Sequence, residues 1–248
     1  MTVWVFGDSY VHDQQQEYQW FKQLSKLMDE PVETRGQPGW SNDFITNQLY
    51  LHCVNGDIKQ DDFVIQIQTQ YSRTWFFEDK PQLSNFVHHN DPTEIGMTRD
   101  EKRATDAWLK HLYNPKGLIW QSYANSMATV GVTSHYAGCK CLTIPAFHNV
   151  LEPYNPWIGI QGTLTECISY LEYADKKEYY AALEQPGGDP RINHMNPHNH
   201  GVLAQKIADS VMTTGEIDLF NGFDTRKPTQ DDFETPQDYE RYLNENSD

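Results

Sequence analysis

A serine near the start of the chain and a histidine near its end are the residues best suited to nucleophilic chemistry. Ser9 closes the triplet Gly-Asp-Ser, and His194 lies just before a stretch with helical spacing. A serine hydroxyl becomes a nucleophile when a base such as a neutral histidine accepts its proton. Gly-Asp-Ser is also a common turn, because Asp and Ser cap helices and Gly opens turns.

The element that must position Ser9 is the apolar run before it. Residues 2–6 read Thr-Val-Trp-Val-Phe, which is typical of a buried strand, and a helical pattern follows a short polar stretch. Ser9 is therefore expected at the carboxyl end of a strand, where ligands bind in open α/β sheets. Backbone N–H groups at such a turn can stabilise a developing oxyanion.

The rest of the chain repeats this alternation. Strands are predicted at 32–34, 64–67 and 140–144, and helices near 20–28, 42–53, 100–113 and 118–136 and from 197 onward. Ser41 is expected to cap the second helix. In the helix at 118–136, the spacing places several residues on one side: Trp120, Tyr123, Ala124, Met127 and Val130. We therefore expect a flavodoxin-like three-layer α/β/α fold with a mostly parallel sheet of four to five strands.

One α/β domain is predicted over residues 1–223, with a long surface excursion at 76–100. An acidic tail is predicted over residues 224–248. From Pro228 onward the chain carries seven acids and one base. This composition is typical of an arm that wraps the domain, binds a protein partner or mediates self-association.

The composition excludes several classes of function. The formal net charge of the 248 residues is −16, which disfavours binding to nucleic acid and to anionic membranes. No apolar run approaches about 20 residues, and Met1 leads directly into a strand, so neither a membrane span nor a signal peptide is expected. Cytoplasmic location is the default expectation, with a phage-encoded protein carried on a particle as the alternative. The four cysteines lack the spacing of a redox or zinc motif.

Four stretches, in order, resemble the blocks of the SGNH (GDSL-like) hydrolase family. The first is the strand that ends in Gly-Asp-Ser9, and the second is Gly-Gln-Pro-Gly39-Trp-Ser-Asn42. In the third, a strand leads into Gln68-Thr-Gln70, where the family usually has Gly-x-Asn. The last is His194-Met-Asn-Pro-His-Asn-His200 before a helix. Together the blocks span residues 3–208, most of the chain.

The resemblance implies a serine esterase that needs no cofactor. Ser9 would be the nucleophile and His194 the base. The N–H groups of Ser9 and Gly39 and the amide of Gln70 would form the oxyanion hole. The family further suggests an ester substrate, such as an O-acetyl group on a carbohydrate.

Two positions depart from the family pattern. Gln70 replaces the oxyanion-hole asparagine, and its amide lies one methylene further out. The triad aspartate normally lies three residues before the histidine, where this chain has Arg191. Asp189 could complete the triad if the loop bulges; otherwise a backbone carbonyl would orient His194 in a dyad. These departures keep an alternative open: an SGNH-shaped binding or structural module without chemistry, such as part of a phage particle or a larger assembly.

Three further features have two interpretations each. Arg73 follows the third strand and could anchor a substrate or pair with an acid. Trp40 lies in a loop and could stack on a sugar or pack in the core. The histidines of the last block could bind a metal, but only Asp189 offers a nearby acidic ligand, so we predict no metal. For His198 and His200 the alternative is packing and capping at a helix start.

Overall fold

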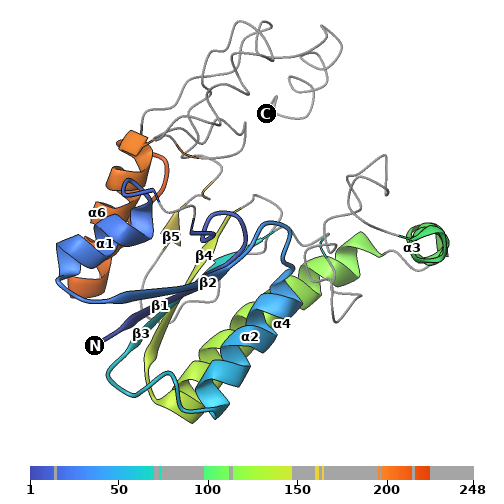
Figure 1. Ribbon diagram of the computed structural model, residues 1–248, viewed down its shortest axis with the longest axis horizontal. Helices are drawn as coiled ribbons and strands as arrows, with labels where there is room; N and C mark the ends of the chain where they lie inside the picture. The colour runs from blue at the N-terminus through green and yellow to red at the C-terminus, as the bar shows by residue number, and fades with distance from the viewer. Residues whose placement is uncertain are drawn as a thin grey trace, which may run out of the picture.

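The computed structural model describes residues 1–13, 16–69, 73, 98–111, 114–146, 160–161, 164, 195, 197–213 and 216–223. Within these ranges, strands and helices alternate (Figure 1). The strands are β1 (Val3–Gly7), β2 (Val32–Gly36), β3 (Phe63–Gln68), β4 (Lys140–Pro145), β5 (Ile160–Gln161) and β6 (Ile217–Asp218). The helices are α1 (Trp20–Met28), α2 (Asn42–Val54), α3 (Arg99–His111), α4 (Pro115–Val132), the π-helical turn η2 (Thr133–Ala137) and α6 (Pro197–Thr213).

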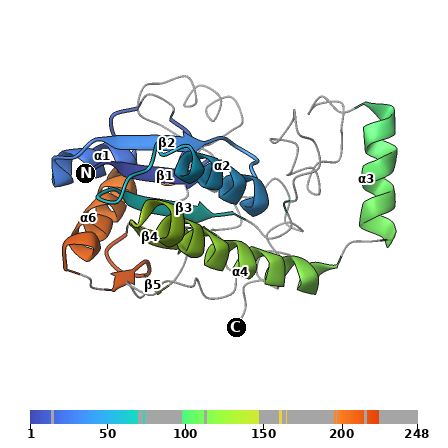
Figure 2. The same cartoon turned by 90° about the horizontal axis from the view of Figure 1, so that it is seen from below.

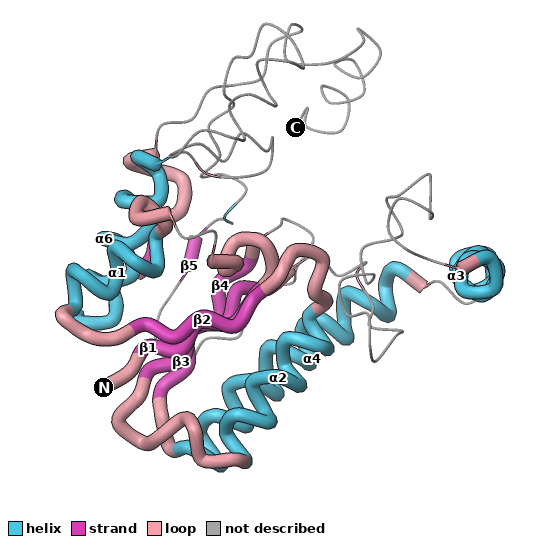
Figure 3. The backbone as a smooth tube through the Cα atoms, in the orientation of Figure 1, coloured by secondary structure: helices cyan, strands magenta, loops and turns pink. Residues whose placement is uncertain are grey.

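The main sheet has four parallel strands in the order β2-β1-β3-β4 (Figure 3). This is the order of the first four strands in flavodoxin-like folds, so the predicted fold class is confirmed. β5 and β6 form a separate parallel pair and add no fifth strand to this sheet. The predicted strands are all present, and β2 extends to Gly36.

Burial follows the position of each strand in the sheet. Every residue of β1 and β3, the two central strands, is buried. Strands covered on both faces need continuous apolar runs, and Val-Trp-Val-Phe and Phe-Val-Ile supply them. β2 is an edge strand that is only half-buried, which explains how it accommodates Glu33 and Arg35.

Helices cover both faces of the sheet, with α1 and α6 on one face and α2 and α4 on the other (Figures 1 and 2). The side chains buried on the α1/α6 face include Val5, Trp20, Leu24, Ile65, Leu142, Leu203 and Ile207. Those on the α2/α4 face include Phe6, Ile45, Leu49, Val64 and Cys141. Full burial of one aliphatic side chain contributes about 1.5–3 kcal/mol, so the two faces hold the layers together. α3 lies beyond α4, outside these layers (Figure 2).

Part of the side on which the sequence spacing gathers the large residues of α4 faces away from the core, although Val130 packs against the core cluster on the α2/α4 face. Trp120 is 65% exposed and Met127 is 44% exposed, whereas Ser126 and Thr129 are fully buried. Polar contacts explain this orientation. The hydroxyl oxygen of Thr129 lies 3.3 Å from that of Thr46 on α2. The side-chain amide of Gln66 on β3 donates to the same Thr46 hydroxyl oxygen at 3.1 Å.

Candidate active site

Ser9 lies in a helical turn that begins at the end of β1 and, with its cap, spans residues 8–12. We call it the serine turn. The carbonyl oxygen of Asp8 accepts hydrogen bonds from the N–H groups of Val11 and His12, both at 3.1 Å. The side-chain carboxylate of Asp8 accepts a further hydrogen bond from the N–H of Tyr10 at 3.1 Å. Asp8 therefore caps this turn, and Ser9 is its first residue. Ser9 is half-buried, and neither its hydroxyl nor its N–H has a hydrogen-bond partner in the described part of the chain.

This turn lies at the topological switch point of the sheet. β1 pairs with β2 on one side and with β3 on the other, so the chain leaves β1 toward one neighbour and later returns to the other. The crevice at the carboxyl ends of such strands is the usual ligand site of open α/β sheets. Ser9 lies at that edge, as predicted from the sequence.

Gly39 lies in a tight turn that follows β2. The Trp40 N–H donates to the Gln37 carbonyl at 3.3 Å, and Gly39, the third residue of this turn, has φ of 86°. With proline second and glycine third, the sequence suits a type II turn. The N–H of Gly39 has no acceptor among the residues that the structure describes. No described acceptor therefore competes with an incoming oxygen for this N–H.

The loops that carry Ser9 and Gly39 leave neighbouring strands side by side. Gly7 pairs with Gly36 in the sheet register. A Cβ added at Gly36 would come within 3.0 Å of three atoms around the serine turn: Val11 Cβ and the carbonyl oxygens of Gly7 and Asp8. This close approach requires glycine at position 36 and places the end of β2, from which the Gly39 loop leaves, in contact with the serine turn.

Arg73 forms a buried ion pair with Asp8. Arg73 Nη1 lies 2.6 Å from Asp8 Oδ2, and the Thr69 hydroxyl donates to the same oxygen at 2.7 Å. The Asp8 side chain is fully buried and that of Arg73 is 6% exposed. Of the two interpretations of Arg73, pairing with an acid is therefore present in the structure, and contact with a substrate stays a prediction.

Asn42 connects the cluster of Asp8, Thr69 and Arg73 to the helix that follows the Gly39 loop. Its amide Nδ2 donates to the Thr69 carbonyl at 2.9 Å, and its Oδ1 accepts from the Thr69 N–H at 2.8 Å. Asn42 is the first residue of α2, and the Ser41 hydroxyl caps that helix by accepting from Phe44, as predicted. Asn42 belongs to the second block of the resemblance, but its contact with Thr69 was not predicted from the sequence.

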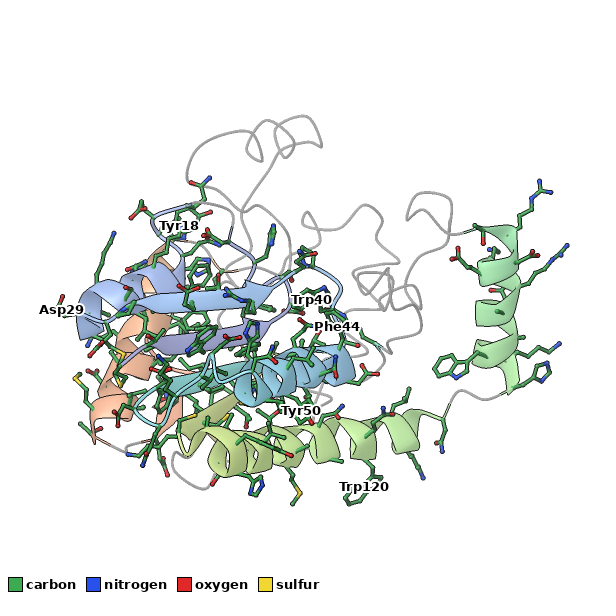
Figure 4. All side chains as sticks on the ribbon, turned by 60° about the horizontal axis from the view of Figure 1, so that its bottom comes forward. Tyr18, Asp29, Trp40, Phe44, Tyr50 and Trp120 are labelled. Carbon is green, nitrogen blue, oxygen red and sulfur yellow. The ribbon has the colours of Figure 1, made fainter. Side chains whose placement is uncertain are left out.

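The Trp40 side chain packs in the hydrophobic core on the α2/α4 face of the sheet. It is 9% exposed and packs edge-on against Phe44, with ring centroids 4.7 Å apart (Figure 4). Core packing, one of its two interpretations, accounts for this position. Contact of Trp40 with a substrate stays a prediction.

The third block of the resemblance differs from the family in its structure as well as its sequence. Gln68 stands where the family usually has glycine, at the last position of β3. Its side chain is 1% exposed, and neither amide atom has a hydrogen-bond partner among the described residues. A buried polar side chain therefore stands at the position where the family usually has glycine.

The start of α6 is tied to the serine turn through Trp20. The indole N–H of Trp20 donates to the Tyr10 carbonyl at 2.9 Å, and its backbone N–H donates to His200 Nδ1 at 3.2 Å. His200 is buried and caps α1, not the start of its own helix α6, whereas His198 is exposed. Met195 is fully buried in the same core cluster as Tyr10. The segment that follows His194 in the sequence is therefore anchored beside the serine turn.

Three of the predicted site residues, His194, Asp189 and Gln70, lie outside the described residues, as do most of the predicted excursion and the tail.

Within the described ranges, no three His, Cys, Asp or Glu side chains are grouped to hold a metal ion. None of the helices described is long and apolar enough to cross a membrane. Comparisons of the chain with protein-family models, with curated proteins and with solved structures found no match.

Proposed function

We propose that this protein is a serine esterase of the SGNH type. The observation that carries the proposal is the setting of Ser9. Its hydroxyl and N–H are unengaged within the described structure, at the switch point of a parallel sheet. Gly39 offers a second unengaged N–H from the adjoining loop. A serine hydroxyl with unengaged N–H donors on its own turn and on the adjoining loop supports an acyl-transfer site.

The proposed reaction proceeds through an acyl-enzyme. His194 accepts the proton of the Ser9 hydroxyl as Ser9 Oγ attacks the ester carbonyl carbon, and the N–H groups of Ser9 and Gly39, with the Gln70 amide, stabilise the resulting oxyanion. The bond between the acyl carbon and the alcohol oxygen then breaks, and His194 returns the proton to the leaving alcohol. Water completes the cycle by the same steps, with Asp189 or a backbone carbonyl orienting His194. An O-acetylated carbohydrate is the proposed substrate class.

Hydrolysis of p-nitrophenyl acetate by wild type and Ser9→Ala tests this proposal. Because the Ser9 hydroxyl has no hydrogen-bond partner in the described residues, its loss should leave the melting temperature unchanged. We expect the rate to fall by about a thousandfold or more. Ser134→Ala removes an exposed hydroxyl from η2 and serves as the matched control, with the wild-type rate expected. An unchanged rate in Ser9→Ala would refute the esterase.

The alternative is a binding or structural module on the same scaffold, docked through its acidic tail. The presence of Gln70 in place of the oxyanion-hole asparagine and of Arg191 in place of the triad acid favours it. This alternative predicts that wild type hydrolyses no acetyl ester above the rate of Ser9→Ala.

A further inference from the structure

The Asp8–Arg73 ion pair lies at the start of the serine turn, because Asp8 is the residue that caps it. Asp8 accepts three hydrogen bonds that shape this turn, two at its carbonyl oxygen and one at Oδ1. Its other carboxylate oxygen is held by Arg73 and Thr69. Any movement of the Asp8 side chain would therefore shift the backbone that carries Ser9 and its N–H.

The same cluster reaches the second loop of the site. Thr69 holds Asp8 through its hydroxyl and Asn42 through its main chain. Asn42 begins α2 three residues after Gly39. A continuous series of hydrogen bonds thus connects the two loops whose N–H groups are proposed to bind the oxyanion.

The positive charge of Arg73 has a second effect, on the electrostatics around Ser9. Asp8 is fully buried one residue from Ser9, in a chain of net charge −16. An unpaired carboxylate there would repel the negative charge that develops on an ester oxygen in the transition state. The guanidinium of Arg73, at 2.6 Å, offsets that charge.

We propose that Arg73 is a positioning residue of the esterase: paired with Asp8, it fixes the serine turn and neutralises the carboxylate behind it. This inference rests on the proposed function. Stabilisation alone is a weak explanation of the pair, because replacing buried ion pairs by apolar residues is often neutral for stability. The pair is therefore expected to act on the rate at which Ser9 reacts.

The test compares wild type, Arg73→Met and Arg73→Lys in two assays: labelling of Ser9 by a fluorophosphonate and steady-state hydrolysis of p-nitrophenyl acetate. Arg73→Met should label more slowly by about tenfold to a hundredfold, the scale of a small misplacement of reacting groups. Its kcat should fall while KM stays the same. Arg73→Lys, which keeps the charge, should recover most of the rate. Arg103→Met removes an exposed arginine that pairs with Asp100 on α3 and should match wild type.

Wild-type rates in a folded Arg73→Met protein with a lowered melting temperature would show that the pair only stabilises the fold, and would overturn the proposal. If Arg73→Met does not fold, the double variant Asp8→Asn/Arg73→Met removes both charges. It should fold and still label about tenfold more slowly, because the turn has lost its ionic anchor; labelling at the wild-type rate would overturn the proposal. Absence of labelling in wild type would instead refute the esterase itself.

Discussion

At the scale of single residues, the site combines features that the sequence predicts with contacts that it does not. Ser9 follows a strand because an apolar run precedes Gly-Asp-Ser, and this much follows from local patterns. The pairing of Asp8 with Arg73 spans 65 positions, and that of Asn42 with Thr69 spans 27. Such contacts depend on which strands become neighbours, so local spacing could not predict them.

The left-handed turn at Gly39 gives a prediction about stability. With φ of 86°, alanine at this position should lower the free energy of unfolding by about 1–2 kcal/mol, because its Cβ disfavours this conformation. Gly131→Ala is the matched control. Gly131 lies in α4 with no atom within 4 Å of the added Cβ, so alanine should stabilise the protein by about 0.5–1 kcal/mol. Urea unfolding measures both. Equal effects of the two substitutions would contradict this interpretation.

The buried thiols predict how stability depends on pH. Burial raises the pKa of Cys141, and it raises the pKa of Cys53 to about 11 and that of Cys139 to about 12. The unfolded thiol ionises at lower pH than the folded one, so stability is full below pH 8 and falls as pH rises above it.

For Cys141 the loss should reach about 1 kcal/mol at pH 9.5. Urea unfolding at pH 7.5 and 9.5 measures it. Cys141→Ala should show a smaller loss between the two pH values than wild type, whatever its stability at pH 7.5. An identical loss in both proteins would show that Cys141 ionises in the folded state.

At the scale of elements, the structure confirms each predicted strand of the main sheet, because strand and helix periodicities are clear in the sequence. The orientation of α4 was not predictable in the same way. Its buried face is set by hydroxyl and amide partners on α2 and β3, while Trp120 points away from the sheet (Figure 4). Apolar spacing carries no information about such polar contacts.

The contact between α1 and α6 includes a hydrogen bond from the Trp20 N–H to His200, which caps α1. His200→Leu removes the acceptor for the Trp20 N–H and should lower the free energy of unfolding by about 1 kcal/mol. His200→Asn keeps an acceptor near the position of Nδ1 and should lose less. The comparison is made by urea unfolding at pH 7.5. A leucine variant at least as stable as the asparagine variant would contradict the capping role.

At the scale of the whole molecule, the site is a consequence of the strand order. With β1 between β2 and β3, the three loops that follow these strands meet at one edge of the sheet. One ion pair and the Asn42 amide then hold the loops together. The alternation of strands and helices predicts a parallel sheet, and the expected flavodoxin-like class includes this strand order. The contacts between loops could not be predicted, because they arise only after the sheet has formed.

The central claim is that Ser9 is an activated nucleophile. Intact-mass analysis after fluorophosphonate treatment tests it most directly, since the probe requires an activated serine but no knowledge of the substrate. Wild type, Ser9→Ala and His194→Ala are compared at equal concentration. One adduct on wild type and none on either variant is the expected result. A folded wild-type protein that gains no adduct, or an adduct that persists in Ser9→Ala, would contradict the claim.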